Sequence, residues 1–360
     1  MNIALKELGK IITGNTPSKK INEFWDSADI CFVKPDIIAD SGVNYIESSN
    51  EYISEEARLK ARVVKKDTIF VTCIGSIGKV GIAASGEYAF NQQINAIVPN
   101  EKVIPKYLAY NILYNRPKLV DIANAPVVPI INKSQFGEFE LNIESDVKQQ
   151  KYMIDVLDKV SDIIALRKVE LEGLDNLIKA RFVEMFGDPI RNTQNRSITD
   201  FINVVKMQRG FDLPVQDRQQ DGNIPVFGSN GALDHHDVAK VQGGGVITGR
   251  SGTIGKVYYT EGDYWPLNTS LFSVDTHGNN IVYLAYLLQM YDLSRFTEGT
   301  GVPTLNRNKF HDKPIIDVPL NEQEEFAVFV RQVDKSKVVV QKALDEAQLL
   351  FDSLMQEYFG

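Results

Sequence analysis

A heptad pattern that occurs twice constrains the fold of this chain more than any other feature. Between residues 147 and 186, apolar side chains recur at alternating steps of three and four, the spacing of a coiled-coil contact seam. The nine seam positions are Leu157, Val160, Ile164, Arg167, Leu171, Leu174, Ile178, Arg181 and Met185, of which seven are apolar. Adding 173 to each number gives a second seam with eight apolar positions, at Val330, Val333, Lys337, Val340, Leu344, Ala347, Phe351, Leu354 and Tyr358. We therefore expect two long helices of one design and a chain that is built twice.

The segments in front of the two helices are also related. Four motifs recur in the same order, with an offset that falls slowly from 177 to 174, as short loop deletions would cause. The matched pairs are Gly-Ser-Ile-Gly-Lys-Val at 75–80 with Gly-Thr-Ile-Gly-Lys-Val at 252–257, Asn91 with Asn268, Tyr-Leu-Ala-Tyr at 107–110 with the same motif at 283–286, and Val-Pro-Ile-Ile-Asn-Lys at 128–133 with Val-Pro-Thr-Leu-Asn-Arg at 302–307. Duplication of a whole domain explains this order better than chance.

Each segment in front of a long helix is predicted to be a head of mixed, β-rich structure. Runs of β-branched and aromatic residues separated by glycine indicate short strands. These runs are 30–34, 68–72, 79–83, 94–98, 246–248, 256–259 and 270–274, and one amphipathic helix per head is predicted at 105–113 and 282–288. The predicted fold is α+β in four parts: a first head at 1–146, a first long helix at 147–190, a second head at 191–320 and a second long helix at 321–360.

The two long helices are expected to pair with each other, antiparallel and within one chain. A helix of 40 residues is about 60 Å long. Equivalent seams that are separated by a whole head can meet when the second helix runs back along the first, which would place the heads at opposite ends of the pair. The alternative is that each helix packs on its own head as ordinary core. The register, held over about four heptads in both copies, favours the coiled coil.

Composition bounds the class of protein. Hydrophobic residues make up 43% and charged residues 24% of the chain, as in globular proteins with a sizeable core. The sequence has no run of eighteen apolar residues and no apolar signal core, so we expect neither a membrane span nor secretion. Cys31 and Cys73 match no metal spacing and indicate reduced thiols in the cytoplasm. The net charge of −8 argues mildly against DNA binding, because the usual footprint is clearly basic.

The repeated glycine turn is the first candidate site. Its residues are Gly75, Ser76 and Lys79 in the first head and Thr253 and Lys256 in the second, with Arg250 as an additional cation. Amides, hydroxyls and ammonium groups of this kind contact DNA phosphates or base edges. A tight β-turn whose glycines take positive φ explains the motif equally well. A phosphate loop is excluded, because that motif needs G-x-x-x-x-G-K-[ST] in front of a helix.

Amide, hydroxyl and basic residues at matching points of the heads form a second group of DNA-binding candidates. In the first head they are Asn91, Gln92, Asn132 and Lys133. Their counterparts in the second head are Asn268 and Thr269 for the first two, and Asn306, Arg307 and Lys309 for the last two. Ser229 and Asn230 are further candidates in the second head. Asn and Gln suit bidentate reading of adenine, and Lys and Arg suit phosphate. Turn-capping amides and solvated loops are the structural alternatives, and both remain open.

The sequence contains no recognisable catalytic motif. An Asn-Pro-Pro-aromatic methylation motif, a metal-binding His/Cys cluster and a G-x-S-x-G elbow are all absent. The four histidines all fall in the second head, whereas a catalytic residue of a duplicated protein should occur in both copies. We expect no catalytic residue, no metal and no cofactor on this chain.

Taken together, these motifs resemble the specificity subunit of type I restriction–modification systems. The residues that carry the resemblance are Gly75 to Val80 with Gly252 to Val257, Ile-Pro-Val-Phe-Gly-Ser-Asn-Gly at 224–231, Trp-Pro-Leu-Asn-Thr at 265–269, Val-Pro-Thr-Leu-Asn at 302–306 and Glu-Gln at 322–323. Their order and duplication extend the resemblance over the whole chain. The first head departs from the pattern, because it lacks a Gly-Ser-Asn-Gly counterpart. Two heads that read different sequences are expected to differ in this way.

The resemblance implies a function in DNA recognition. Each head would be a target recognition domain that reads one half of a bipartite, asymmetric site on double-stranded DNA. The paired helices would set the spacer and dock two methyltransferase subunits, and restriction subunits would join that core. S-adenosylmethionine, ATP and Mg²⁺ would belong to these partners. A near-neutral chain suits this role if the partners supply part of the charge that neutralises phosphate.

Two other classes of function stay open at this point. One is an enzyme that uses the GxxGK turns on a phosphorylated ligand. The other is a non-catalytic scaffold whose heads bind a protein or a glycan.

Overall fold

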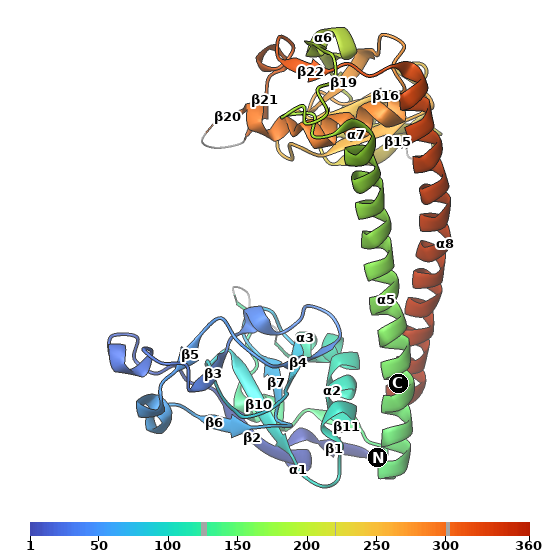
Figure 1. Cartoon of the computed structure of the whole chain (residues 1–360). Helices are drawn as coiled ribbons and strands as arrows, with labels where there is room; N and C mark the ends of the chain where they lie inside the picture. Colours follow the sequence, from blue (N-terminus) through green and yellow to red (C-terminus); the bar gives the residue numbers. More distant parts are fainter. Residues whose placement is uncertain (124–127, 220, 300–302) are drawn as a thin grey trace. The chain divides into compact units, whose positions relative to one another are not determined.

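The structure, a computed structural model, divides into two compact units (Figure 1). It describes residues 1–123, 128–219, 221–299 and 303–360. The first unit is Met1–Leu166 with Ala343–Gly360, and the second is Arg167–Lys342. Each unit therefore contains one head and parts of both long helices. Val302, which belongs to the predicted motif at 302–307, lies outside the described residues.

The first head is built on two sheets and a separate strand pair. The larger sheet has the order β2-β10-β7-β8-β4, the smaller has the order β5-β3-β9-β6, and β1 pairs with β11. The strands are β1 Asn2–Ala4, β2 Gly9–Thr13, β3 Ile30–Val33, β4 Val43–Ile46, β5 Tyr52–Ile53, β6 Val63–Lys65, β7 Ile69–Thr72, β8 Val80–Ala83, β9 Glu87–Phe90, β10 Ile94–Pro99 and β11 Glu140–Asn142. The helices are α1 Leu5–Leu8, α2 Pro105–Tyr114, α3 Arg116–Ile122 and α4 Lys133–Gly137.

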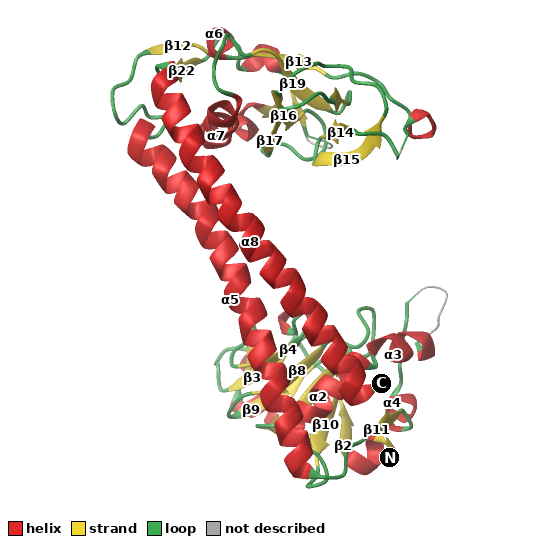
Figure 2. Ribbon diagram, turned by 90° about the vertical axis from the view of Figure 1, so that its right-hand side faces the viewer, coloured by secondary structure: helices red, strands yellow, loops and turns green. Residues whose placement is uncertain are grey.

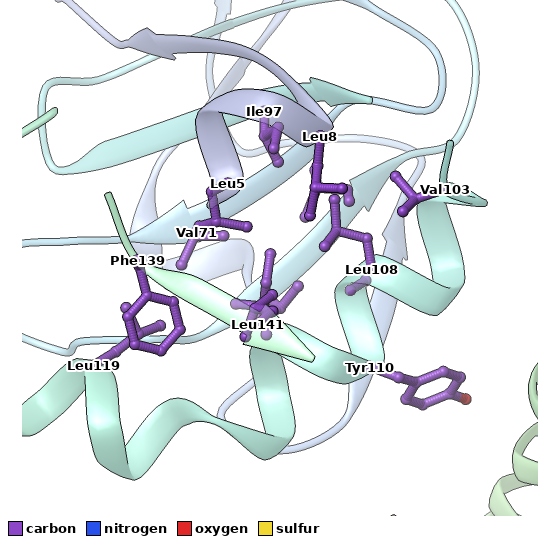
Figure 3. Close-up of a cluster of buried hydrophobic side chains, with 14 of the residues drawn as sticks. Leu5, Leu8, Val71, Ile97, Val103, Leu108, Tyr110, Leu119, Phe139 and Leu141 are labelled. Atoms are coloured by element: carbon purple, nitrogen blue, oxygen red, sulfur yellow. The ribbon is translucent and has the colours of Figure 1, made fainter. Parts of the chain in front are cut away.

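Helix α2 covers the larger sheet and anchors the head to the first long helix. Its buried Leu108 joins Leu5, Leu8 and Val71 in one apolar cluster, which Figure 3 shows in close-up. Burying each such side chain stabilises the fold by about 1.5–3 kcal/mol. Tyr110, a buried member of the same cluster, lies at its margin, and its hydroxyl donates to Asp158 Oδ1 at 2.8 Å. One helix thus links the sheet to the long helix.

The second head repeats this plan. Its larger sheet has the order β13-β19-β16-β17 and its smaller sheet the order β15-β14-β18, while β12 pairs with β22 and β20 with β21. The strands are β12 Ile198–Asp200, β13 Lys206–Arg209, β14 Ile224–Gly228, β15 Gly231–His236, β16 Gly245–Gly249, β17 Val257–Thr260, β18 Trp265–Pro266, β19 Ser270–Asp275, β20 Thr297–Glu298, β21 Thr304–Leu305 and β22 Pro314–Ile316. The helices are α6 Phe201–Val204 and α7 Ile281–Tyr291.

The topology confirms the predicted duplication. The run β2-β10-β7-β8 matches β13-β19-β16-β17, and the parallel pair of β3 with β9 matches that of β14 with β18. All seven predicted strands and both predicted head helices are present, with bounds shifted by a few residues. The two heads are therefore copies of one α+β design.

One predicted match between the heads is wrong by one residue. Cys73 N donates to Gln93 O at 2.7 Å, and Arg250 N donates to Thr269 O at 2.8 Å. Gln93 is therefore the counterpart of Thr269, and Asn268 corresponds to residue 92 rather than to Asn91. From Ala83 at the end of β8 to Phe90 at the end of β9 the chain is one residue longer than from Thr260 at the end of β17 to Pro266 at the end of β18, so the constant offset fails there.

The two long helices confirm the predicted seam. They are α5 Val147–Phe186 and α8 Leu320–Phe359, and every predicted seam position is buried or half-buried. In the first unit, Val160 and Ile164 of α5 pack with Ala347 of α8. In the second unit, Lys337 Nζ lies 2.6 Å from Asp175 Oδ1. Within each unit the helices run side by side and antiparallel, as Figures 1 and 2 show.

The ends of the long helices complete the cores of the heads. Phe182 and Phe186 at the end of α5 are fully buried in the core of the second head. Met355 and Phe359 at the end of α8 are buried in the core of the first head. Leu157, near the start of α5, also joins the first core, so packing on the helix's own head occurs beside the coiled coil.

A buried glutamine fixes each head to the long helix that follows it. Gln150 is fully buried, and its Oε1 accepts the backbone N–H of Ile104 at 2.9 Å, just before α2. Gln323, 173 positions later, accepts the N–H of Asn280 at 2.9 Å, just before α7. Each Nε2 donates to a nearby backbone carbonyl as well. The duplicated glutamine therefore sets how each head meets its helix.

Candidate nucleic-acid interface

The glycine turn of the first head lies beside the loop that leads to Asn132. Gly75 and Gly78 have φ of 76° and 74°, which explains the two glycines. Thr72 Oγ1 accepts the N–H of Lys79 at 3.0 Å and closes the turn. Gly75 N donates to Pro129 O at 3.1 Å, so two segments that the sequence treats separately are adjacent.

The second head repeats this contact. Gly252 and Gly255 both have φ of 90°. Gly252 N donates to Pro303 O at 3.4 Å, and Leu305 N donates to Arg250 O at 2.8 Å. In both heads the glycine turn therefore supports the loop that carries the Asn-Lys or Asn-Arg pair.

The lysines of the two turns differ in environment. The Lys79 side chain is 12% exposed and its ammonium pairs with Asp40, which lowers the pKa of that carboxyl. Arg116 buttresses the same turn through Ile77 O at 2.8 Å. Lys256 is exposed instead, so among the turn residues Gly75, Ser76 and Lys256 are open to a ligand. Contact of Lys79 with DNA stays a prediction that would require its ion pair to open.

The Gly-Ser-Asn-Gly turn of the second head joins this region. Lys256 Nζ lies 3.3 Å from Asn230 Oδ1, and Ser229 Oγ approaches Gly252. Thr253 of the glycine turn is half-buried beside them. Residues 34–36 of the first head correspond to residues 228–230, because Val33 pairs with Phe90 as Phe227 pairs with Pro266. Sequence comparison found no counterpart there.

The predicted amide pairs are partly engaged in the protein itself. Asn91 is 7% exposed, and its Nδ2 donates to Gln93 Oε1 at 2.9 Å, whereas Gln92 is exposed. Asn268 is half-buried and donates to Asp212, and the adjacent Thr269 is also half-buried. Asn91 thus matches the turn-capping alternative in this structure.

The Asn-Lys and Asn-Arg pairs start short helical turns in equivalent positions. Asn132 Oδ1 accepts the N–H of Gln135 at 2.9 Å and caps α4, which leaves Lys133 exposed. Asn306 Oδ1 accepts the N–H of Asn308 at 3.1 Å, and the following Arg307 is half-buried. The amides fix the turn, and the cation after each amide is free to meet a ligand.

These elements line a cationic cavity in the second head, which we call the second groove. Its volume is about 380 Å³. Its lining residues include Arg209, Arg250, Glu298, Thr304, Asn306 and Arg307. Glu298 is neutralised by Lys309 at 2.8 Å, so the three arginines dominate its charge. Arg250 is held by its Nε, which donates to Asn268 O at 2.9 Å.

The first head has a cavity in the equivalent place, which we call the first groove. It measures about 460 Å³, and its lining residues include Lys10, Thr13, Arg62 and Lys133. Both grooves lie between an edge strand, β2 or β13, and the Asn-Lys or Asn-Arg turn. The sequence predicted Lys133, Arg250, Asn306 and Arg307 but missed Lys10, Arg62 and Arg209. A cation next to a glycine that leaves a strand, as at Arg209-Gly210, is a weak signal that could have been found.

Metal clusters and membrane-spanning helices were considered as well, within the part of the chain that the structure describes. Within 1–123, 128–219, 221–299 and 303–360, no group of three His, Cys, Asp or Glu side chains could hold a metal ion. Across the same ranges, no helix is long and apolar enough to cross a membrane.

The chain belongs to the family of type I restriction modification DNA specificity domains, whose model matches residues 1–176 and 191–347. It is similar to the specificity subunit of the type I restriction enzyme MjaIX of Methanocaldococcus jannaschii, with 31% identity over 196 residues, 53% of this chain and 45% of that protein. The EcoprrI specificity subunit of Escherichia coli is 20% identical over 351 residues, 92% of this chain and 87% of that protein. The first of these matches spans less than half of the relative's length.

Solved structures agree on the fold. The type I restriction-modification S subunit from M. genitalium matches with a TM-score of 0.63 and 14% identity, over 100% of this chain and 96% of that chain. A chain from a study of complex assembly and conformational transition of the type I R-M system matches with a TM-score of 0.61 and 14% identity. The match covers 99% of this chain and 97% of that chain. At this identity the likeness concerns the fold alone.

Proposed function

We propose that this chain is the specificity subunit of a type I restriction–modification complex and that each head reads one half of a bipartite, asymmetric site on double-stranded DNA. The main support is the duplicated cationic groove, present once in each head. Lys and Arg side chains that neutralise phosphates drive binding to the DNA backbone. Because the grooves differ in their lining, the two half-sites differ in sequence.

The paired helices set the spacer between the two half-sites. This part of the proposal is supported by the unbroken α5 of 40 residues and by a seam that continues in both units. A helix adds 1.5 Å per residue, so its length converts directly into a number of base pairs.

The outer faces of the long helices dock two methyltransferase subunits, which restriction subunits then join. Leu166 and Val339 are 68% and 69% exposed, and they occupy equivalent positions of α5 and α8. Leu177 and Leu350, 46% and 50% exposed, form a second equivalent pair. Exposed apolar side chains at repeated positions are expected where two copies of one partner bind.

Catalysis and cofactors belong to these partners. The methyltransferase subunits carry S-adenosylmethionine and methylate adenine N6, and the restriction subunits use ATP and Mg²⁺ to cleave DNA. This chain contributes recognition. It acts beside the DNA in the cytoplasm, where Cys31 and Cys73, both buried, stay reduced.

Methylome sequencing of source cells with and without the gene tests the proposed function. Deletion is expected to remove one methylated bipartite motif, and reintroduction of the gene is expected to restore it. An unchanged methylome would contradict the proposal. The double variant Leu166→Glu with Val339→Glu should also abolish methylation while the purified chain keeps its DNA affinity. Its control is Lys335→Glu, a charge change at an exposed position of α8.

A further inference from the structure

The two grooves allow phosphate contacts and base contacts to be separated within a single chain. This inference rests on the proposed function, in which both heads meet the same kind of DNA backbone but different bases. A groove position that keeps its chemistry in both heads is then suited to phosphate. A position that changes its chemistry is suited to the bases, because only bases carry the difference between half-sites.

Backbone hydrogen bonds assign the counterparts. Gly14 N donates to Ile94 O at 3.0 Å, and Gly210 N donates to Ser270 O at 3.1 Å, so these glycines are equivalent. The residue before each glycine lines its groove, which pairs Thr13 with Arg209.

Two further pairs follow from the turns. Arg250 takes the place of Cys73, because Arg250 N donates to Thr269 O and Cys73 N donates to Gln93 O, the equivalent carbonyl. Arg307 takes the place of Lys133, since both follow the asparagine that caps the turn.

The three pairs divide into two kinds. Lys133 and Arg307 keep a positive charge, as a phosphate contact requires. The other two positions of the second head are Arg209 and Arg250. The first head has Thr13 and Cys73 there. The Thr13 hydroxyl donates to Asn95 Oδ1 at 2.6 Å, and Cys73 is 2% exposed. Charge at those positions is therefore particular to the second head.

The two arginines have the geometry that reading of bases needs. Arg250 is anchored through its N–H, its carbonyl and its Nε, which leaves the two terminal nitrogens of the guanidinium for a ligand. Arg209 is exposed at the end of β13, with no side-chain hydrogen bond or ion pair to any residue in the described ranges. Arginine donates two hydrogen bonds to guanine O6 and N7 in the major groove, a pairing that the other bases do not accept.

We propose that Arg209 and Arg250 read guanine in the half-site of the second head, and that Arg307, like Lys133 in the first head, holds phosphate. The half-site read by the second head then contains G·C pairs, and the two arginines determine them. The first head recognises its half-site without arginine at these positions.

The test is methylome sequencing of cells that carry the gene with Arg209→Ala, Arg250→Gln or Arg307→Gln. Arg209→Ala and Arg250→Gln should each relax one G·C position of one half-site, with discrimination falling roughly 5- to 150-fold, and leave the other half-site unchanged. Arg307→Gln should lower methylation at all sites alike and leave the motif unchanged. The control is Lys313→Ala, an exposed cation of the second head outside the groove.

The outcomes separate this inference from the proposed function. If the wild-type gene directs a bipartite motif but both arginine variants keep that motif, the base-reading roles are wrong while the proposed function stands. A second half-site without any G·C pair, or a change in both half-sites, also overturns the inference. If deletion of the gene leaves the methylome unchanged, the proposed function itself fails. Arg209 is exposed, so we expect the Arg209→Ala variant to fold. Thermal unfolding of the Arg250→Gln variant shows whether that variant folds as the wild type does.

Discussion

The ring of Phe359, at the end of α8, packs against the ring of Tyr107 in the first head, with centroids 5.3 Å apart. In the second unit, Phe186 at the end of α5 packs against Tyr283 at 5.1 Å. Both tyrosines belong to the repeated Tyr-Leu-Ala-Tyr motif, so the aromatic contact is duplicated together with the heads. Each head therefore depends for its core on the helix that follows the other head.

Phe359→Ala should destabilise the first unit although the residue is far from that head in sequence. Truncating a fully buried phenylalanine costs about 3–5 kcal/mol, because a cavity remains. Hydrogen exchange of the amides in α2 measures the effect and should accelerate accordingly. Leu349→Ala is the control, because this leucine of α8 is 72% exposed and its loss costs under about 0.5 kcal/mol. Equal exchange in the two variants would mean that α8 does not complete the first core.

Gln323→Ala should loosen the second head from its helix. Gln323 is 1% exposed, and it bonds Asn280 N at 2.9 Å, Asn279 Oδ1 at 2.7 Å and Val318 O at 2.8 Å. Truncation leaves these buried groups unpaired, at about 1–3 kcal/mol for each group that water cannot reach. Urea unfolding monitored by tryptophan fluorescence reports the loss, since Trp265 lies in this head.

Two matched variants complete the glutamine experiment. Gln150→Ala should weaken the first unit in the same way, because that side chain makes the equivalent bonds. Gln348→Ala removes an exposed glutamine of α8 that bonds only Asp352 in the described structure, and it should be nearly silent. If all three variants unfold at the same urea concentration, the glutamines do not hold the heads.

The helices and strands that depend on local sequence pattern could be predicted from periodicity alone. The bounds of α5, Val147–Phe186, agree with the extent of the heptad pattern rather than with the longer segment 147–190, because a heptad seam specifies a helix whatever it packs against. The strands around the glycine turn were predicted for a similar reason, since Gly75 and Gly78 punctuate β-branched runs. Internal duplication then supplied the domain plan without any knowledge of contacts.

The grooves could not be predicted, because they form where segments of unequal length converge. Arg209 lies 196 positions after Thr13, whereas Arg250 lies 177 after Cys73, so no single offset aligns the two pairs. The ion pair of Lys79 with Asp40 is equally non-local, and it turned a predicted contact residue into one that is engaged in the protein. The seam pattern also did not reveal which head receives the end of each helix.

His311 should make the stability of the second unit depend on pH. Its Nε2 accepts the backbone N–H of Met207 at 3.2 Å, which requires the neutral ring. Burial, then the charges of Arg307 and Lys206, lower the pKa of His311 from its usual 6.5, and Asp312 opposes this only in part. The unfolded chain therefore binds a proton more readily than the folded chain, so this stability is present above pH 6.5 and is lost as pH falls below it.

The pH effect can be assigned to His311 by substitution. Thermal unfolding of the wild type between pH 8 and pH 5 should show a falling midpoint below pH 6.5. His311→Gln keeps an acceptor for Met207 N but does not titrate, and its midpoint should fall less over that range. The control His235→Gln removes an exposed histidine of the same head and should retain the wild-type slope. A His311→Gln variant with the full wild-type slope would place the pH dependence elsewhere.

Lengthening both long helices by one heptad should lengthen the spacer of the recognised site. Seven residues placed after Leu171 in α5 and seven after Lys337 in α8 preserve the seam and keep the pair of Lys337 with Asp175 on one side of the insertion. The added rise is about 10.5 Å, roughly three base pairs at 3.4 Å each. Methylome sequencing should then find both half-sites unchanged and about three more base pairs between them. The control with the insertion in α5 alone breaks the pairing register and should lose methylation. An unchanged spacer in the double insertion would show that the helices do not set the distance between half-sites.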